Sequence, residues 1–292
     1  MSTLQDPCKL VRARPSILVQ ELAKSNGFLR VELCDEPHAM EVLMSIMPHL
    51  RLRQVQELDL GRLERCERPR EEMPDRGPEC EDVCDEDDML IIPRFFGTAV
   101  QLEFLKSLRL GKACLDQASG ADQYGKWDVE YLCEAIPHFK SLHSLCLRGL
   151  ELTAADGWDI LKACHKCKSL KELDLSDNSL HELSEVVEYV DVVCGLESLN
   201  LSCNALGEFD DDSVGADLTA SALVALITQY TSLTHLDLSS NAMGNREGFT
   251  IAEALRKCTH LTTLNLRANS WASPVDDQIE SAWRGGVGGL LV

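Results

Sequence analysis

The chain has 292 residues, 46 of them leucine, and its 28 basic and 48 acidic residues give a formal net charge of −20. About 45% of the residues are hydrophobic, enough for a sizeable core, which excludes a chain that is disordered throughout. No apolar run reaches the ~18 residues that a membrane-spanning helix needs, and residues 1–30 hold no apolar signal core. The acidic balance disfavours nucleic acids and anionic membranes as partners.

The thirteen cysteines do not indicate a disulfide framework, because their number is odd and many lie in apolar helical segments. Reduced thiols are typical of the cytoplasm and nucleus. We therefore expect a cytoplasmic or nuclear protein.

The first predicted element, in chain order, is a helical stretch within residues 1–27, marked by Ile17, Leu18 and Leu22. From residue 28 onward one frame recurs: apolar, two variable, apolar, one variable, apolar. Each frame predicts a short strand whose apolar side chains face inward. The frames start at Phe28, Val55, Leu105, Leu142, Leu170, Leu196, Leu233 and Leu261.

An asparagine follows each of the last four frames by three residues: Asn178, Asn204, Asn241 and Asn269. An asparagine side chain carries both donors and an acceptor. We expect these four to satisfy backbone groups at the turn where each strand ends.

The frame with its asparagine resembles the leucine-rich repeat, L-x-x-L-x-L-x-x-N-x-L. The starts are 27, 50, 37, 28, 26, 37 and 28 residues apart, so the basic unit is about 28 residues. That length, with helical segments such as 156–163 and 244–255 after the strands, is similar to the ribonuclease-inhibitor-like subclass. The resemblance implies an α/β fold: a right-handed curved solenoid of about eight repeats, with parallel strands on the concave side and helices on the convex side.

Domain boundaries follow from the repeats. Residues 1–27 are predicted to form an N-terminal helical cap and residues 28–270 the solenoid. In residues 271–292, Ser273 and Pro274 indicate a helix start, with serine as the N-cap and proline at the first helical position. This helix is predicted to form the C-terminal cap, with Ile279, Ala282 and Trp283 closing the last repeat. A flexible glycine-rich tail is expected after it.

Three units exceed 28 residues, and each excess falls between the strand turn and the helix: 63–88, 116–125 and 208–217. Equivalent loops of a solenoid lie on one rim, where insertions often line a binding face. Loop closure entropy grows slowly with length, so the fold also tolerates such insertions without any function.

The first insertion, at about 64–88, holds 12 acids, 4 bases and three prolines, and we expect it to be disordered. It is interpreted as a solubilising loop, as a surface for a basic partner, or, least in favour, as a cation site. Its dense acidic run comprises Glu79, Glu81, Asp82, Asp85, Glu86, Asp87 and Asp88.

Strand positions that face outward on the concave side supply a second candidate surface. Basic side chains in the repeats that start at 105 and 142 and acidic ones in those that start at 170, 196 and 233 predict a charge gradient that could orient a partner. A merely solvated sheet face is the alternative. The candidates are Lys106, Arg109, Lys112, His143, Arg148, Glu172, Asp174, Asp177, Glu197 and Asp237.

No catalytic motif is found, and neither a cofactor nor a metal is expected. Cys164 and Cys167 form a CxxC pair without a second pair at metal-ligand spacing. The sequence therefore favours a non-enzymatic scaffold that binds a protein partner, with no nucleic acid or membrane. The alternative is an activator of a small GTPase, because the subclass includes the Ran GTPase-activating proteins. Arg62 and Arg148 are then the positional candidates for stabilising phosphoryl-transfer charge. The sequence does not decide the oligomeric state.

Overall fold

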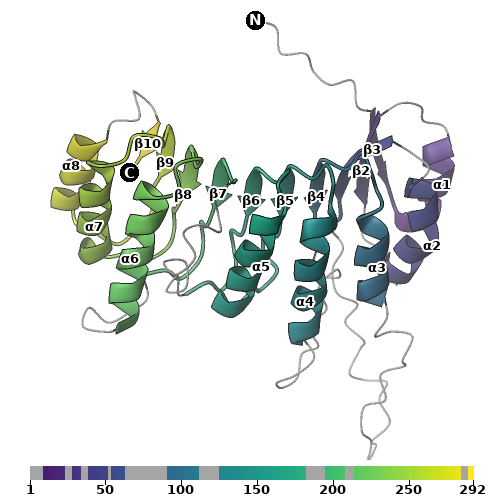
Figure 1. Ribbon diagram of the computed structural model, residues 1–292, viewed down its shortest axis with the longest axis horizontal. Helices are drawn as coiled ribbons and strands as arrows, with labels where there is room; N and C mark the ends of the chain where they lie inside the picture. The colour runs from purple at the N-terminus through teal and green to yellow at the C-terminus, as the bar shows by residue number, and fades with distance from the viewer. Residues whose placement is uncertain are drawn as a thin grey trace, which may run out of the picture. The chain divides into compact units, whose positions relative to one another are not determined.

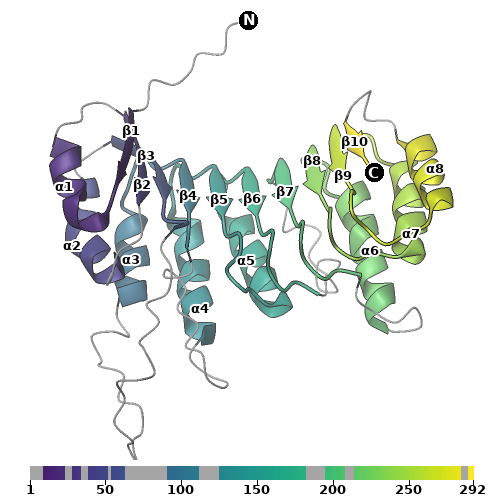
Figure 2. The same ribbon diagram turned by 180° about the vertical axis from the view of Figure 1, so that it is seen from behind.

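The computed structural model describes residues 9–23, 28–33, 39–51, 54–62, 91–111, 125–181, 195–207, 214–283 and 289–292. They belong to two compact units, an N-terminal unit of residues 1–135 and a C-terminal unit of residues 136–292. In each unit the strands lie side by side and the helices lie together on one side of them (Figures 1 and 2).

The N-terminal unit alternates strands and helices, and its strands pair in parallel in the order β1-β2-β3-β4. Helices α1 and α2, α2 and α3, and α3 and α4 are in contact. The elements are β1 (Lys9–Ala13), α1 (Pro15–Ala23), β2 (Phe28–Leu33), α2 (Ala39–Arg51), β3 (Gln54–Asp59), α3 (Ile91–Ala99), β4 (Ser107–Arg109) and α4 (Gly125–Ala135).

The C-terminal unit has the same construction, with parallel strands in the order β5 to β10. Helix α7 contacts both α6 and α8. The elements are the 3-10 helix η4 (Ile136–His138), β5 (Ser144–Cys146), α5 (Ala154–Lys166), β6 (Glu172–Asp174), β7 (Ser198–Asn200), α6 (Val214–Thr228), β8 (His235–Asp237), α7 (Asn245–Leu255), β9 (Thr263–Asn265), α8 (Ser273–Ala282) and β10 (Leu290–Leu291).

Frame leucines form the core of the C-terminal unit. Leu145, Leu173, Leu199, Leu236 and Leu264 are in register on five neighbouring strands, and each is at most 2% exposed. No repeat can bury this apolar face alone, so each is stabilised by its neighbours. Every predicted frame coincides with a strand, from β2 to β9, and the predicted α/β solenoid of leucine-rich repeats is confirmed.

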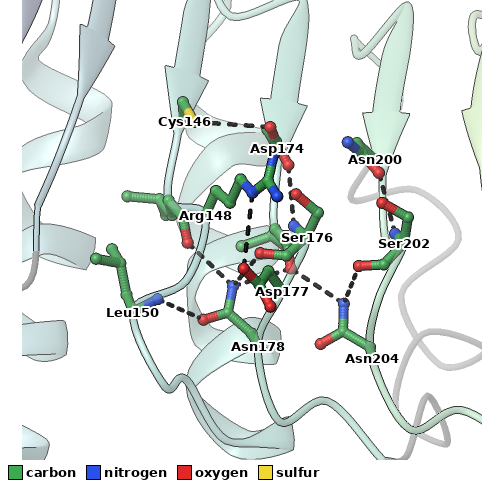
Figure 3. A network of polar contacts seen from close by, with 12 residues as sticks. Cys146, Arg148, Leu150, Asp174, Ser176, Asp177, Asn178, Asn200, Ser202 and Asn204 are labelled. Atoms are coloured by element: carbon green, nitrogen blue, oxygen red, sulfur yellow. Dashed lines mark hydrogen bonds and ion pairs between the residues drawn. The ribbon is translucent and has the colours of Figure 1, made fainter. Parts of the chain in front are cut away.

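The asparagines at the strand ends form a ladder, as the sequence predicts. Asn178 Nδ2 donates to Leu147 O of the preceding repeat at 3.0 Å and to Leu175 O of its own at 2.9 Å. Its Oδ1 accepts from the N–H groups of Leu150 and Leu152. Each such side chain joins two neighbouring repeats, so the ladder sets how the strands end relative to one another (Figure 3).

Glycines let the helices approach the next repeat. A Cβ on Gly157 in α5 would lie 2.6 Å from Leu180 Cδ2, and one on Gly248 in α7 would overlap Val275 Cγ1. Helix α5 begins with a capping box, in which Thr153 N donates to Asp156 Oδ2 at 2.9 Å and Asp156 N to Thr153 Oγ1 at 3.4 Å.

The chain ends differ from the expectations in three respects. Residues 1–27 contain a strand, β1, as well as the helix α1, and β1 pairs with β2. The glycine-rich tail ends in β10, which pairs with β9. The N-cap of α8 is Ala272, not Ser273, because the helix already begins at Ser273, and Asn245 Oδ1 of the preceding repeat accepts the Ala272 N–H at 2.8 Å.

The insertions lie almost wholly outside the described residues. The acidic insertion at 64–88 does so entirely. The other two end earlier than predicted, because Gly125 already belongs to α4 and residues 214–217 to α6.

Candidate functional site

The outward residues of β5 to β9 form two polar rows, which we call the C-terminal strand face. Alternate residues of a strand point to opposite sides of the sheet, so a buried leucine row leaves its neighbours outside. One row is Ser144, Glu172, Ser198, His235 and Thr263, and the other is Cys146, Asp174, Asn200, Asp237 and Asn265. This surface therefore repeats from strand to strand, about 4.8 Å apart.

The second row also fixes the turns that follow the strands. Asp174 Oδ1 accepts the Ser176 N–H at 2.9 Å, and Asn200 Oδ1 accepts the Ser202 N–H at 3.0 Å (Figure 3). Asp237 Oδ1 does the same for Ser239 at 2.9 Å. These carboxylates and amides hold their own backbone as Asx turns do, so Asp174 and Asp237 have structural roles beside any contact with a partner.

The residue before each ladder asparagine has a left-handed backbone. The φ angles are 59° at Asp177, 54° at Cys203, 56° at Ser240 and 57° at Ala268. Non-glycine residues in this region cost about 1 kcal/mol or more each. The surrounding hydrogen bonds of the ladder hold this turn in each of these repeats.

Two ion pairs join neighbouring repeats beside the C-terminal strand face. Arg148 Nε lies 3.7 Å from Asp177 Oδ2, and Lys171 Nζ lies 3.2 Å from Glu197 Oε1. All four side chains are well exposed, so each pair contributes little to stability. Among the described residues no cation pairs with Glu172, which leaves this exposed carboxylate available to a partner.

A second polar surface lies on β1 to β4. Arg12, Glu32, Asp59 and Arg109 are in register across the four strands. Arg30 and Glu57 form a parallel pair two residues earlier on β2 and β3. We call these six residues, with Arg62 beyond the end of β3, the N-terminal strand face.

Cross-strand ion pairs connect the residues of the N-terminal strand face. Glu32 pairs with two arginines: Arg12 Nη2 lies 2.8 Å from Glu32 Oε2, and Arg62 Nε lies 3.4 Å from Glu32 Oε1. Arg30 Nε lies 2.6 Å from Glu57 Oε2, and Arg109 Nε lies 3.9 Å from Asp59 Oδ1. Each carboxylate therefore has a guanidinium partner on a neighbouring strand or turn.

Gly61 provides the space for Arg109. A Cβ on Gly61 would overlap Arg109 Nε and lie 2.9 Å from its Cδ. Asp59 Oδ1 accepts the Gly61 N–H at 2.8 Å, so the same carboxylate orders the turn and faces the guanidinium. A larger residue at position 61 would displace the arginine.

The predicted partner residues are divided between the units. Lys106 and Arg109 belong to the N-terminal unit, and His143, Arg148, Glu172, Asp174, Asp177, Glu197 and Asp237 to the C-terminal unit. Asp174 and Asp237 are half-buried, and the others are exposed. Lys112 and the acidic run at 79–88 lie outside the described residues.

Sequence reasoning did not predict the two arginines Arg12 and Arg30. It also missed the three carboxylates of this face, Glu32, Glu57 and Asp59. The signal was present, because Arg12 lies between buried Val11 and Ala13. An alternation of charged and apolar residues predicts a half-buried strand even without a complete leucine frame.

The described residues contain no group of three or more histidine, cysteine or acidic side chains that could hold a metal. Cys164 and Cys167 are buried free thiols, and Cys167 Sγ contacts Phe139 O at 3.8 Å. Within the described ranges, no helix has the length and apolar character to cross a membrane.

Comparisons with known proteins agree with the repeat assignment. A family model described as Leucine Rich repeat matches residues 166–181 and 230–246. Tonsoku-like protein from Bos taurus is 34% identical over 162 residues, which is 55% of this chain and 11% of that protein. The Mus musculus Tonsoku-like protein is 29% identical over 167 residues, 56% of this chain and 11% of that protein.

The chain thus spans about a tenth of the length of these relatives. Among solved structures, the crystal structure of a TLR13–ssRNA13 complex has a TM-score of 0.40 and 22% identity, and it covers 61% of this chain and 22% of that one. The matched segments and the structure together show that the chain contains leucine-rich repeats.

Proposed function

We propose that this protein is a non-enzymatic scaffold that binds a protein partner through its strand faces. The observation that supports this most is the C-terminal strand face, where polar side chains from five strands are in register. The leucine core beneath and the asparagine ladder beside it hold the backbone of this face in place. A preorganised surface loses little conformational freedom on binding, so many shallow contacts can add up to specific recognition.

The charge of the C-terminal strand face favours a basic partner. Glu172, Asp174 and Asp237 lie on its strands, and two further acidic residues border it in the ion pairs with Arg148 and Lys171. Charge of this kind steers encounter and sets orientation more than it sets affinity. Glu172, which has no cationic partner among the described residues, is the residue most suited to receive a lysine or arginine.

A charge-reversal pair tests the C-terminal strand face. Glu172→Arg should weaken capture of a partner from native cells, whereas Glu253→Arg makes the same charge change on an exposed position of α7 and should leave capture unchanged. Equal capture by both variants would remove this face from the proposal. An unchanged unfolding midpoint of both variants shows that folding is intact.

The acidic insertion is a second part of the proposal. Deletion of residues 64–88 removes a net charge of −8 from the chain. It should weaken the binding of a basic partner most at low salt, where screening is weakest. Capture that does not change after the deletion would exclude the insertion from binding.

The alternative function is activation of a small GTPase. Arg62 and Arg148 are exposed near strand ends, where a cation could stabilise phosphoryl-transfer charge, although both pair with a carboxylate. GTP hydrolysis by a panel of small GTPases, with and without the protein, tests this alternative. Acceleration that Arg62→Ala or Arg148→Ala abolishes would replace the scaffold proposal.

Two finer assignments belong to the same proposal. The frame spacing of about 28 residues and the alternation of strands with helices such as α5 and α7 support the ribonuclease-inhibitor-like subclass. The free thiols of the described cysteines support a reducing compartment, the cytoplasm or the nucleus.

A further inference from the structure

Acidic side chains occupy the middle of the C-terminal strand face. Glu172 and Asp174 lie on β6 and Asp237 lies on β8, and none of the ten outward strand residues of this face is lysine or arginine. In the turns after the strands the backbone ladder continues and places Arg148, after β5, and Arg267, after β9, at the two ends of one row. A cationic segment of a partner is therefore attracted most strongly over β6 to β8.

The three carboxylates keep capacity to accept further hydrogen bonds. Among the described residues, no lysine, arginine or histidine pairs with them. Asp174 Oδ2 accepts from the Cys146 thiol at 3.6 Å, and Asp237 Oδ2 accepts from Asn265 Nδ2 at 2.9 Å. Each carboxylate oxygen has about two acceptor positions, so both Oδ2 atoms can also receive a cationic donor.

The other oxygens of the two aspartates hold these carboxylates in place. Asp174 Oδ1 accepts the Ser176 N–H at 2.9 Å (Figure 3). Asp237 Oδ1 accepts the Ser239 N–H at 2.9 Å and the Ser239 hydroxyl at 2.6 Å. The strands therefore set the separation of the two carboxylates. Asp174 on β6 and Asp237 on β8 are two strand spacings apart, about 9.6 Å.

We propose that the C-terminal strand face binds a basic segment of a partner protein in the polyproline II conformation, with two cationic residues three positions apart. This rests on the proposed scaffold function and specifies the ligand of one of its faces. A polyproline II helix has three residues per turn and rises about 3.1 Å per residue, so side chains three positions apart share one side at about 9.3 Å. Along a β-extended segment the side chains of one side are about 7 or 14 Å apart, and neither distance matches two strand spacings.

The two cations of the segment then have different partners. A cation over β6 reaches both Glu172 and Asp174, which are two residues apart and point to the same side of the strand. A cation over β8 reaches Asp237. Between them, Asn200 on β7 has a side-chain NH2 group that donates to no described residue. A polyproline II backbone has no internal hydrogen bonds, so one of its carbonyls can accept from this amide.

Fluorescence anisotropy with the full chain tests the proposal. The probe is a labelled peptide of Pro, Ala and Ser with two Lys three positions apart, and the control peptide has the same composition with the two Lys two positions apart. We expect the three-position peptide to bind about threefold to tenfold more tightly, and to weaken as salt rises. A third peptide, rich in Ala and helical, has two Lys seven positions apart, about 10.5 Å along the helix, and should bind more weakly than the probe.

Asp237→Asn separates binding from the structural role of this side chain. The asparagine loses the charge but keeps an oxygen for the Ser239 N–H, as Asn200 Oδ1 does for the Ser202 N–H at 3.0 Å. The variant should weaken the three-position peptide about threefold to tenfold and abolish its advantage over the control peptide. Asp159→Asn, the same change on an exposed position of α5, should alter neither.

Glu172→Gln is a second variant that does not depend on the turn. Glu172 is exposed and holds no described group, so its unfolding midpoint in urea should stay unchanged. It should still weaken the three-position peptide about threefold to tenfold, because the cation over β6 loses one of its two carboxylates.

Three results would overturn the inference: equal binding of the two Pro-containing peptides, an Asp237→Asn variant that keeps the preference for the three-position peptide, or tighter binding of the helical peptide. Failure of the scaffold proposal is separate, because it is measured by partner capture and the Glu172→Arg variant. A partner that is still captured while the three-position peptide does not bind leaves the scaffold and removes the polyproline II ligand.

Discussion

Asn241→Ala should destabilise the C-terminal unit more than the alanine substitution of any other asparagine in the ladder. Asn241 is fully buried, and its Nδ2 donates to Leu201 O at 2.9 Å, Leu238 O at 3.0 Å and Ser239 O at 3.3 Å. Its Oδ1 accepts the Asn204 N–H at 3.2 Å. The alanine variant loses all four contacts.

The loss in the free energy of unfolding depends on which backbone groups keep a hydrogen-bond partner in the variant. The three carbonyls keep one donor each, from Asn204 Nδ2 at 3.0 Å, Asn269 Nδ2 at 3.1 Å and the Cys203 N–H at 2.9 Å. Each lost second bond costs about 0.5 kcal/mol, and the buried Asn204 N–H, left without a partner, costs about 2 kcal/mol. The free energy of unfolding should therefore fall by about 3 to 4 kcal/mol.

Urea unfolding followed by circular dichroism and tryptophan fluorescence measures this loss. The control is Asn265→Ala on the strand face, where Asn265 Nδ2 donates to Asp237 Oδ2 at 2.9 Å but the groups are half-exposed and reach water when unpaired. We expect the control to lose less than ~1 kcal/mol. Equal losses in the two variants would refute the reasoning that buried backbone groups make the ladder important.

Three further predictions concern packing and pH. Leu236→Ala, in the core row, should lower the free energy of unfolding by about 2 to 5 kcal/mol, and an unchanged midpoint would contradict its core position. Gly248→Ala should cost about 1 to 3 kcal/mol, because the new Cβ lies 3.2 Å from Trp271 Cε3 and overlaps the next helix. Gly97→Ala, in α3 with open space around it, should instead raise stability by up to about 1 kcal/mol in the same urea unfolding assay. Burial lowers the pKa of His260 from 6.5, so the unfolded chain binds the proton more readily, and the stability contributed above pH 6.5 is lost as the pH falls. His260→Gln should flatten the stability profile between about pH 7 and pH 5, and a profile as steep as that of the wild type would assign the acid sensitivity to other groups.

The repeat frame predicted most of the architecture because its signal is local. A leucine two residues from the next leucine specifies a strand with one buried side, and an asparagine three residues later specifies the turn. Leu236 and Asn241 thus have the environments that their positions in the frame predict. Strand β1 was missed because its residues, Lys9–Ala13, carry the alternation without the complete frame.

The candidate surfaces were only partly predictable. Outward positions such as Glu172 follow from the alternation along one strand. Their pairing partners depend on which residues of two strands share a register. The partners are 26 residues apart in Lys171–Glu197 and 37 residues apart in the ladder contact Asn204–Asn241. Sequence spacing alone does not specify such distances, since the insertions change the length of each unit.

The sequence by itself determined the leucine-rich repeat, the strand positions, the buried leucine row and the asparagine turns, because all of these depend on residues a few positions apart. Only the tertiary structure decided that Arg12, Glu32, Asp59 and Arg109 share one row, since that row brings together residues from β1 to β4 that span about a hundred positions of the chain. It also decided that Arg109 lies over Gly61 and that β10 extends the sheet beyond β9. The physical reason is that strand register and side-chain pairing are set by packing between repeats, whereas the frame records only packing within one.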